Sequence, residues 1–177
     1  MPSGRTHDAI TFILAVPSLA VTYAATGSVS ASIVVAAAFV FGGLMFGPDL
    51  DTVSCQYSRW FFLRFLWFPY RSFFKHRSRF SHGLIFGALI RVVYFMGVAT
   101  LIAYLLAFAW TAMSGDRVPD ATNFAKAWRM IGDFVRANFG EHFFLLSFIG
   151  LWLGAASHTF TDLAGSFIKT GRVAKFL

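Results

Sequence analysis

The chain has little of what soluble and secreted domains depend on. It contains 1 cysteine in 177 residues, which excludes an intramolecular disulfide framework. Charged residues make up only 13% of the chain, against about 25% in a typical soluble domain. The sequence has no phosphate-binding glycine loop, no Gly-x-Ser-x-Gly elbow, no internal repeat and no low-complexity tail. These absences argue against a disulfide-rich domain, a P-loop protein, an α/β-class serine hydrolase and a repeat protein.

Long hydrophobic runs dominate instead, and hydrophobic residues make up 57% of the chain. Four stretches, at about 9–25, 31–47, 84–110 and 143–164, are long enough to cross a bilayer as helices. We therefore expect an all-α, polytopic membrane protein. Residues 1–177 would form one integral membrane domain, a four-helix transmembrane bundle with interfacial amphipathic segments.

The first stretch admits a second interpretation, as a cleaved signal peptide. Arg5 would be its basic region, and Tyr23-Ala24-Ala25 would lie near the cleavage site. Cleavage would discard His7 and Asp8, which belong to the pattern described below. We therefore expect this stretch to be retained as a membrane helix.

Basic residues predict the orientation of the bundle. One end of it carries ten of them: Arg5, Arg59, Arg64, Arg71, Lys75, Arg77, Arg79, Lys169, Arg172 and Lys175. By the positive-inside rule this end, with both termini, faces the cytoplasm. Basic residues beside apolar helices typically contact anionic lipid head groups. We therefore expect membrane lipids as partners and no nucleic acid.

Histidine and aspartate residues lie at the ends of all four hydrophobic stretches. In an up-down bundle, the starts of the first and third helices share a membrane face with the ends of the second and fourth. Eight residues are thereby expected on one face: His7, Asp8, Asp49, Asp51, His76, His82, His158 and Asp162. Carboxylates and imidazoles gathered in one place are what a metal site needs.

The spacing of these residues supports a metal site. His158 and Asp162 are four apart, so a helix presents them on one face, as when such a pair chelates one ion. Asp49 and Asp51 lie where a proline ends a helix and could ligate one ion or bridge two. Taken singly, such residues could instead cap a helix, bind a lipid phosphate or form a buried hydrogen-bonded pair. Cys55 could ligate as well, but we expect an inert thiol.

Two further segments have the character of membrane-surface elements. Residues 59–74 combine arginines with many aromatic side chains and a proline, which favours an in-plane or re-entrant element under the site. An aromatic lipid-binding groove is the alternative. After Asp120, apolar residues recur at helical spacing, which predicts an amphipathic helix on the opposite membrane surface.

Four short motifs carry a family resemblance. They are Pro-Ser-Gly-Arg-Thr-His-Asp at Pro2–Asp8, Pro-Asp-Leu-Asp at Pro48–Asp51, His-Arg-Ser-x-x-Ser-His-Gly at His76–Gly83 and Ser-His-x-x-x-Asp at Ser157–Asp162. Through them the chain resembles a bacterial family of uncharacterised metal-binding membrane proteins. It is also similar to the LexA-binding, inner-membrane-associated hydrolases and, more remotely, to the zinc-dependent phospholipase C superfamily. The resemblance implies a metal site and a hydrolase, although no additional glutamate on this face offers a separate general base.

Together these features predict a metal-dependent hydrolase, acting on a phosphoester at the cytoplasmic membrane face. Zinc is the expected cofactor, as one or two ions, with manganese or iron as alternatives. The expected ligands are His7, Asp49, Asp51, His82, His158 and Asp162. Asp8 would orient His7 or act as a base, and His76 would be a ligand or proton donor. Arg77, Arg79 and Arg91 would hold the anionic substrate.

Two other functions remain open from the sequence. The same residues could form a structural metal site in a non-catalytic accessory or assembly subunit of a larger membrane complex. Metal transport is the less favoured of the two, because transport sites lie near the bilayer midplane and no charged residues continue from this face toward the other.

Overall fold

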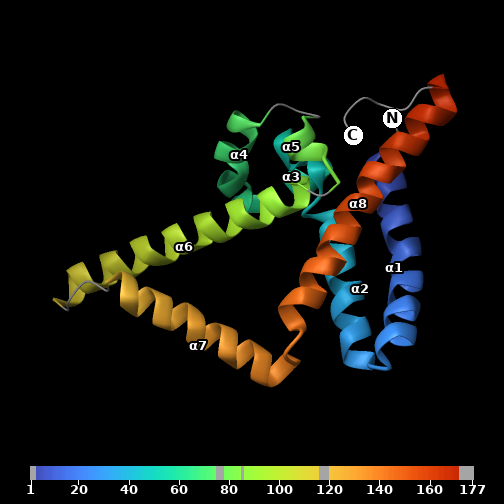
Figure 1. Cartoon of the computed structure of the whole chain (residues 1–177). Helices are drawn as coiled ribbons and strands as arrows, with labels where there is room; N and C mark the ends of the chain where they lie inside the picture. The colour runs from blue at the N-terminus through green and yellow to red at the C-terminus, as the bar shows by residue number, and fades with distance from the viewer. Residues whose placement is uncertain (1–2, 75–77, 85, 116–119, 172–177) are drawn as a thin grey trace.

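The computed structural model describes residues 3–74, 78–84, 86–115 and 120–171 (Figure 1). Within these ranges every regular element is helical. In chain order they are α1 Gly4–Thr26, α2 Val29–Leu44, η1 Pro48–Asp51, α3 Cys55–Ser58, η2 Phe61–Trp67, α4 Phe68–Phe73, α5 Arg79–His82, α6 Phe86–Ser114, α7 Ala121–Phe139 and α8 Phe143–Thr170.

Four helices are long and apolar enough to cross a membrane. They are α1, α2 with its continuation through η1, α6 and α8. This finding confirms the expected all-α fold with four apolar helices. The helices begin and end near the expected boundaries, although α8 continues to Thr170, beyond the predicted end at residue 164.

Helices α1, α2 and α8 pack side by side, and α2 contacts both of the others (Figure 1). The approach of α2 and α8 is close enough to require glycine. A Cβ on Gly154 would lie 2.0 Å from the carbonyl oxygen of Phe39, and one on Gly42 would lie 2.3 Å from that of Leu151. Small residues commonly allow membrane helices to approach in this way. The last turns of α2 are therefore held against α8 just before His158.

Helices α6 and α7 form an arm beside this bundle. Helix α6 leaves the bundle at an angle, and α7 returns toward the start of α8 (Figure 1). The arm is attached near the start of α6, where the indole of Trp152 donates to the carbonyl oxygen of Leu84. Helix α7 is the predicted amphipathic helix, and it begins where Asp120 accepts a hydrogen bond from the backbone N–H of Asn123 at 2.8 Å.

The aromatic segment after η1 packs against the end of α2. Arg59 Nη1 and Trp60 Nε1 each donate, at 2.8 Å, to one of the last carbonyl oxygens of α2 and its cap, groups that a helix leaves unsatisfied. Trp67 and Tyr70 are fully buried in the same cluster. Phenylalanines cover the outside of this segment and are exposed, as suits the predicted position at a membrane surface: Phe61, Phe62, Phe65, Phe68 and Phe73.

Two glycines bring short helices into position around the polar end of the bundle. A Cβ on Gly47 would lie 2.2 Å from Nε2 of Gln56, so a glycine at this position leaves room for the Gln56 side chain beside the backbone that precedes η1. A Cβ on Gly87 would lie 2.7 Å from the carbonyl oxygen of Ser81, so α5 can rest on the start of α6. These two close contacts place η1 and α5 next to each other at the polar end of the bundle.

Candidate metal centre

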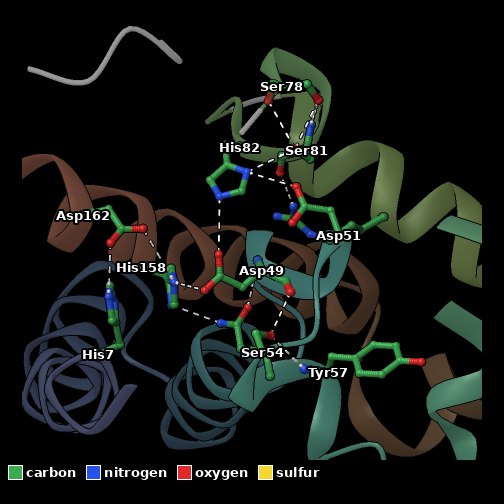
Figure 2. A network of polar contacts seen from close by, with 12 residues as sticks. His7, Asp49, Asp51, Ser54, Tyr57, Ser78, Ser81, His82, His158 and Asp162 are labelled. Carbon is green, nitrogen blue, oxygen red and sulfur yellow. Dashed lines mark hydrogen bonds and ion pairs between the residues drawn. The ribbon is translucent and has the colours of Figure 1, made fainter. Parts of the chain in front are cut away.

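Six of the predicted ligands lie together at one end of the bundle. Figure 2 shows their side chains pointing toward one another from α1, η1, α5 and α8. Asp49 is half-buried and the other five are buried: His7, Asp51, His82, His158 and Asp162. Because these residues come from four separate segments, the fold itself assembles the cluster.

Three buried residues of α1 and α8 form the tightest group. His7, His158 and Asp162 each offer a ligand atom, and these atoms lie within 4.8 Å of one another, so the group could hold a metal ion. The His7 Nε2 atom lies 3.3 Å from Asp162 Oδ1, and His158 Nε2 lies 3.9 Å from Asp162 Oδ2. The two imidazole rings stack with centroids 3.9 Å apart.

The carboxylate of Asp162 fits a cation better than it fits its present surroundings. Its side chain is 2% exposed, and neither of its oxygens has a hydrogen-bond partner among the described residues. Burying an ionised carboxylate without donors is costly unless an opposite charge compensates it. The nitrogen and oxygen donors of this group match a divalent metal ion, which would supply that charge.

Asp49 joins this group to a second one. Its Oδ2 lies 3.3 Å from His158 Nε2, and its Oδ1 lies 3.4 Å from His82 Nε2. On the other side of the imidazole, His82 Nδ1 lies 3.4 Å from Asp51 Oδ2. Burial by itself would lower the pKa of His82, but hydrogen bonds to Asp49 and Asp51 outweigh it and raise this pKa above its ordinary value. Imidazoles and carboxylates therefore alternate across the site.

Gln56, which no sequence motif marks, lies beneath this chain of contacts. Its Oε1 accepts from the backbone N–H of Asp49 at 3.1 Å, and its Nε2 donates to the carbonyl oxygen of Gly43 at 2.8 Å. The same Nε2 lies 3.1 Å from His158 Nδ1. Ser54 Oγ donates to the Asp49 carbonyl oxygen at 2.8 Å. The backbone of Asp49 is thus fixed from both sides.

A pocket of about 190 Å³ leads to the cluster. Its lining includes His7, Asp49, Gln56, His158 and Asp162, together with Gly4, Asp8, Cys55 and Arg59 nearer the surface. This volume can hold several water molecules, each of which occupies about 30 Å³ in the liquid. The pocket therefore has room for a small group beside these side chains.

Arg59 is a second pocket residue that the motifs do not mark, although it lies in the arginine-rich segment. Its guanidinium forms an ion pair with Asp8, and the two side chains are 32% and 29% exposed. Asp8, which was expected to orient His7 or to act as a base, thus has Arg59 as its ion-pair partner.

The remaining predicted residues lie apart from the pocket or outside the described ranges. Arg91 is 2% exposed. Its Nη1 donates to the carbonyl oxygen of Ser81 at 2.6 Å, so it anchors α5 next to His82 and does not line the pocket. Arg79 begins α5, but its side chain is not among those described. His76 and Arg77 lie outside the described residues.

Comparisons with known proteins agree with a metal site. The family model described as "Uncharacterized metal-binding protein (DUF2227)" matches residues 2–172. An uncharacterized protein of Aquifex aeolicus (strain VF5) is 30% identical over 132 residues, which cover 74% of this chain and 89% of that protein. No solved structure matches the chain.

Proposed function

The chain belongs to the DUF2227 family of uncharacterized metal-binding proteins, and we propose that it is a membrane-embedded, metal-dependent hydrolase. Its substrate would be a phosphoester at the cytoplasmic face of the bacterial inner membrane. One observation carries the proposal: Asp162, His7 and His158 form a buried group that could hold a metal ion, and this group lines a pocket. A structural ion would need no such access.

The donor set favours zinc. Imidazole nitrogens and carboxylate oxygens suit zinc first, with manganese or iron as alternatives. The ion would lie in the space that His7, His158 and Asp162 surround beside Asp49, and His82 with Asp51 could hold a second one. A divalent ion in this place would supply Lewis-acid activation of water and of a phosphoryl group.

The protein's own residues would bind and orient the substrate. Arg59 is the cationic side chain of the pocket, and a guanidinium pairs well with a phosphate oxygen. Its second contact, from Nη1 to the carbonyl oxygen of Leu44, holds the guanidinium in place beside the pocket. The walls formed by α1, α3 and α8 would exclude bulk water from the cluster.

The location supports a substrate at the membrane surface. The cluster lies toward the end of the bundle where α1 begins and α2 terminates, and the sequence predicts that basic residues are concentrated at the same end. Under the positive-inside rule this end faces the cytoplasm. A lipid head group would meet the pocket there without leaving the interface.

The test combines metal content with phosphoesterase activity of the detergent-purified full chain. We expect about one or two zinc ions per chain and hydrolysis of a phosphoester panel that includes phospholipids. Both should be lost in Asp162→Asn. Asp133→Asn, the same change at an exposed position on α7, is the matched control and should retain both. A zinc-loaded protein that leaves every phosphoester and phospholipid intact would refute the hydrolase.

A second candidate function is a structural metal site in an accessory subunit of a larger membrane complex. The arm formed by α6 and α7 favours it, because large apolar side chains on α6, among them Leu105, Leu106 and Met113, lie exposed. Another membrane protein could cover them as well as lipid can. Co-purification of a defined partner, together with zinc that is bound but inactive, would support this function over hydrolysis.

A further inference from the structure

The amide of Gln56 has only one orientation that satisfies its neighbours. A backbone N–H can only donate, so the atom that faces the Asp49 N–H at 3.1 Å must be oxygen. A carbonyl oxygen can only accept, so the atom that faces the Gly43 carbonyl at 2.8 Å must be the NH₂ group. Turning the amide over would oppose like groups at both ends. The side chain is buried, at 3% exposure, so water does not offer the amide other partners.

This orientation decides which nitrogen of His158 carries the proton. The second N–H of the Gln56 NH₂ group faces His158 Nδ1 at 3.1 Å, so Nδ1 must accept. A neutral imidazole has one N–H, which then resides on Nε2. That N–H lies on the side of the site, with Asp49 Oδ2 3.3 Å and Asp162 Oδ2 3.9 Å from Nε2, and it has no hydrogen-bond partner among the described residues.

A histidine that binds metal normally shows the opposite arrangement. Its ligating nitrogen is bare, and its other nitrogen donates an N–H to a carboxylate, a carbonyl oxygen or water. In His158 the nitrogen that faces the site bears the proton, and the other one receives a hydrogen bond. His7 is not constrained in this way, because its Nδ1 has no hydrogen-bond partner among the described residues. His7 can therefore leave Nε2 bare beside Asp162.

We propose that His158 is not a metal ligand but the hydrogen-bond donor of the site, and that Gln56 is the positioning residue that keeps its proton on Nε2. The ion would then be held by His7 and Asp162, whose Nε2 and Oδ1 atoms lie 3.3 Å apart. The inference deepens the proposed function and rests on it for the presence of a metal ion. Because His158 also lines the pocket, its Nε2–H can donate to an oxygen of a bound phosphoester.

The first experiment needs no metal. Nitrogen NMR of the metal-free, detergent-purified chain with isotope-labelled histidine distinguishes a protonated from an unprotonated ring nitrogen in each of the 5 histidines. We expect His158 to have its proton on Nε2, and the Nδ1–H form to gain population in Gln56→Met, which removes the donor. A wild-type His158 with its proton on Nδ1 would overturn the proposal.

The second experiment counts imidazole ligands by X-ray absorption of the zinc-loaded chain. His158→Gln should leave the imidazole count per zinc unchanged, whereas His7→Gln should lower it by one. His142→Gln, at the start of α8 and outside the pocket, is the matched control and should change nothing. A count that falls in His158→Gln would overturn the proposal. If wild type binds no zinc, the proposed function fails, while the NMR result still decides which nitrogen of His158 is protonated.

Discussion

Replacing Asp162 by asparagine should change the stability of the protein in opposite directions with and without metal. The carboxylate is 2% exposed, and neither oxygen has a hydrogen-bond partner among the described residues. Its nearest compensating group is His7 Nε2, at 3.3 Å. Asparagine keeps the shape of the side chain and removes its charge.

The size of each effect follows from burial and from binding. A buried polar group without a hydrogen bond costs about 1–3 kcal/mol, and more when it is charged. With partial compensation by His7, we expect metal-free Asp162→Asn to be about 1 kcal/mol more stable than wild type, or roughly 2–4 °C in Tm for a chain of this length. With zinc at one hundred times its Kd, wild type should gain about 2.7 kcal/mol. The variant should gain little, because it has lost a ligand.

Thermal unfolding followed by circular dichroism in detergent, with a chelator or with excess zinc, measures both effects. Asp133→Asn makes the same change on the exposed surface of α7 and should behave like wild type in both conditions. The reasoning would be refuted if metal-free Asp162→Asn unfolded at a lower temperature than wild type while zinc still raised its Tm by the wild-type amount.

Three further predictions follow from particular contacts. Gly154→Val should destabilise the protein by about 1–3 kcal/mol, because the added side chain meets the Phe39 carbonyl. At Gly97 a Cβ would meet no atom within 4 Å, so Gly97→Val should lower the stability far less in the same thermal unfolding assay. In the metal-free protein, the raised pKa of His82 contributes stability that is fully present below the ordinary histidine pKa of about 6.5. This stability is lost as the pH rises through the pKa of His82 in the folded protein. Tm measured against pH should therefore fall over that interval, and it should fall less steeply in His82→Gln. Arg59→Gln should raise the KM for a phosphoester about tenfold, as loss of one charge-assisted hydrogen bond implies, while the zinc content stays unchanged.

The meeting of the motif residues could be predicted because it needs only the order of helices along the chain. Alternate ends of successive membrane helices share one face, so residues at those ends converge whatever the detailed packing. His7, at the start of α1, and Asp162, near the end of α8, meet for this reason although the whole chain separates them. The four apolar helices were predictable on equally simple grounds of length and composition.

The side chains around the ligands could not be predicted, because their roles depend on how the chain turns. Gln56 reaches the site only because the backbone at Gly47 leaves room for it, and neither residue belongs to a motif whose spacing would indicate this. Asp8 and Arg59 pair across fifty-one positions of sequence. Arg91 occurs in the sequence as an isolated charge in an apolar helix, which fits an anion-binding role as well as the anchoring of α5 that the structure shows. Periodicity cannot distinguish these possibilities.

The polar cluster also links the bundle to the segment that leads into the arm. Asp49 faces one imidazole from α8 and another from α5, and α5 leads into the arm that otherwise attaches to the bundle near the start of α6. An ion at this junction would therefore stabilise the arm against the bundle whichever function it serves, so stabilisation by zinc cannot by itself distinguish a catalytic site from a structural one. The pocket can, because a structural ion gains nothing from an opening lined by Arg59. Access to the ion and the guanidinium beside it are thus the features on which the choice between hydrolase and accessory subunit depends.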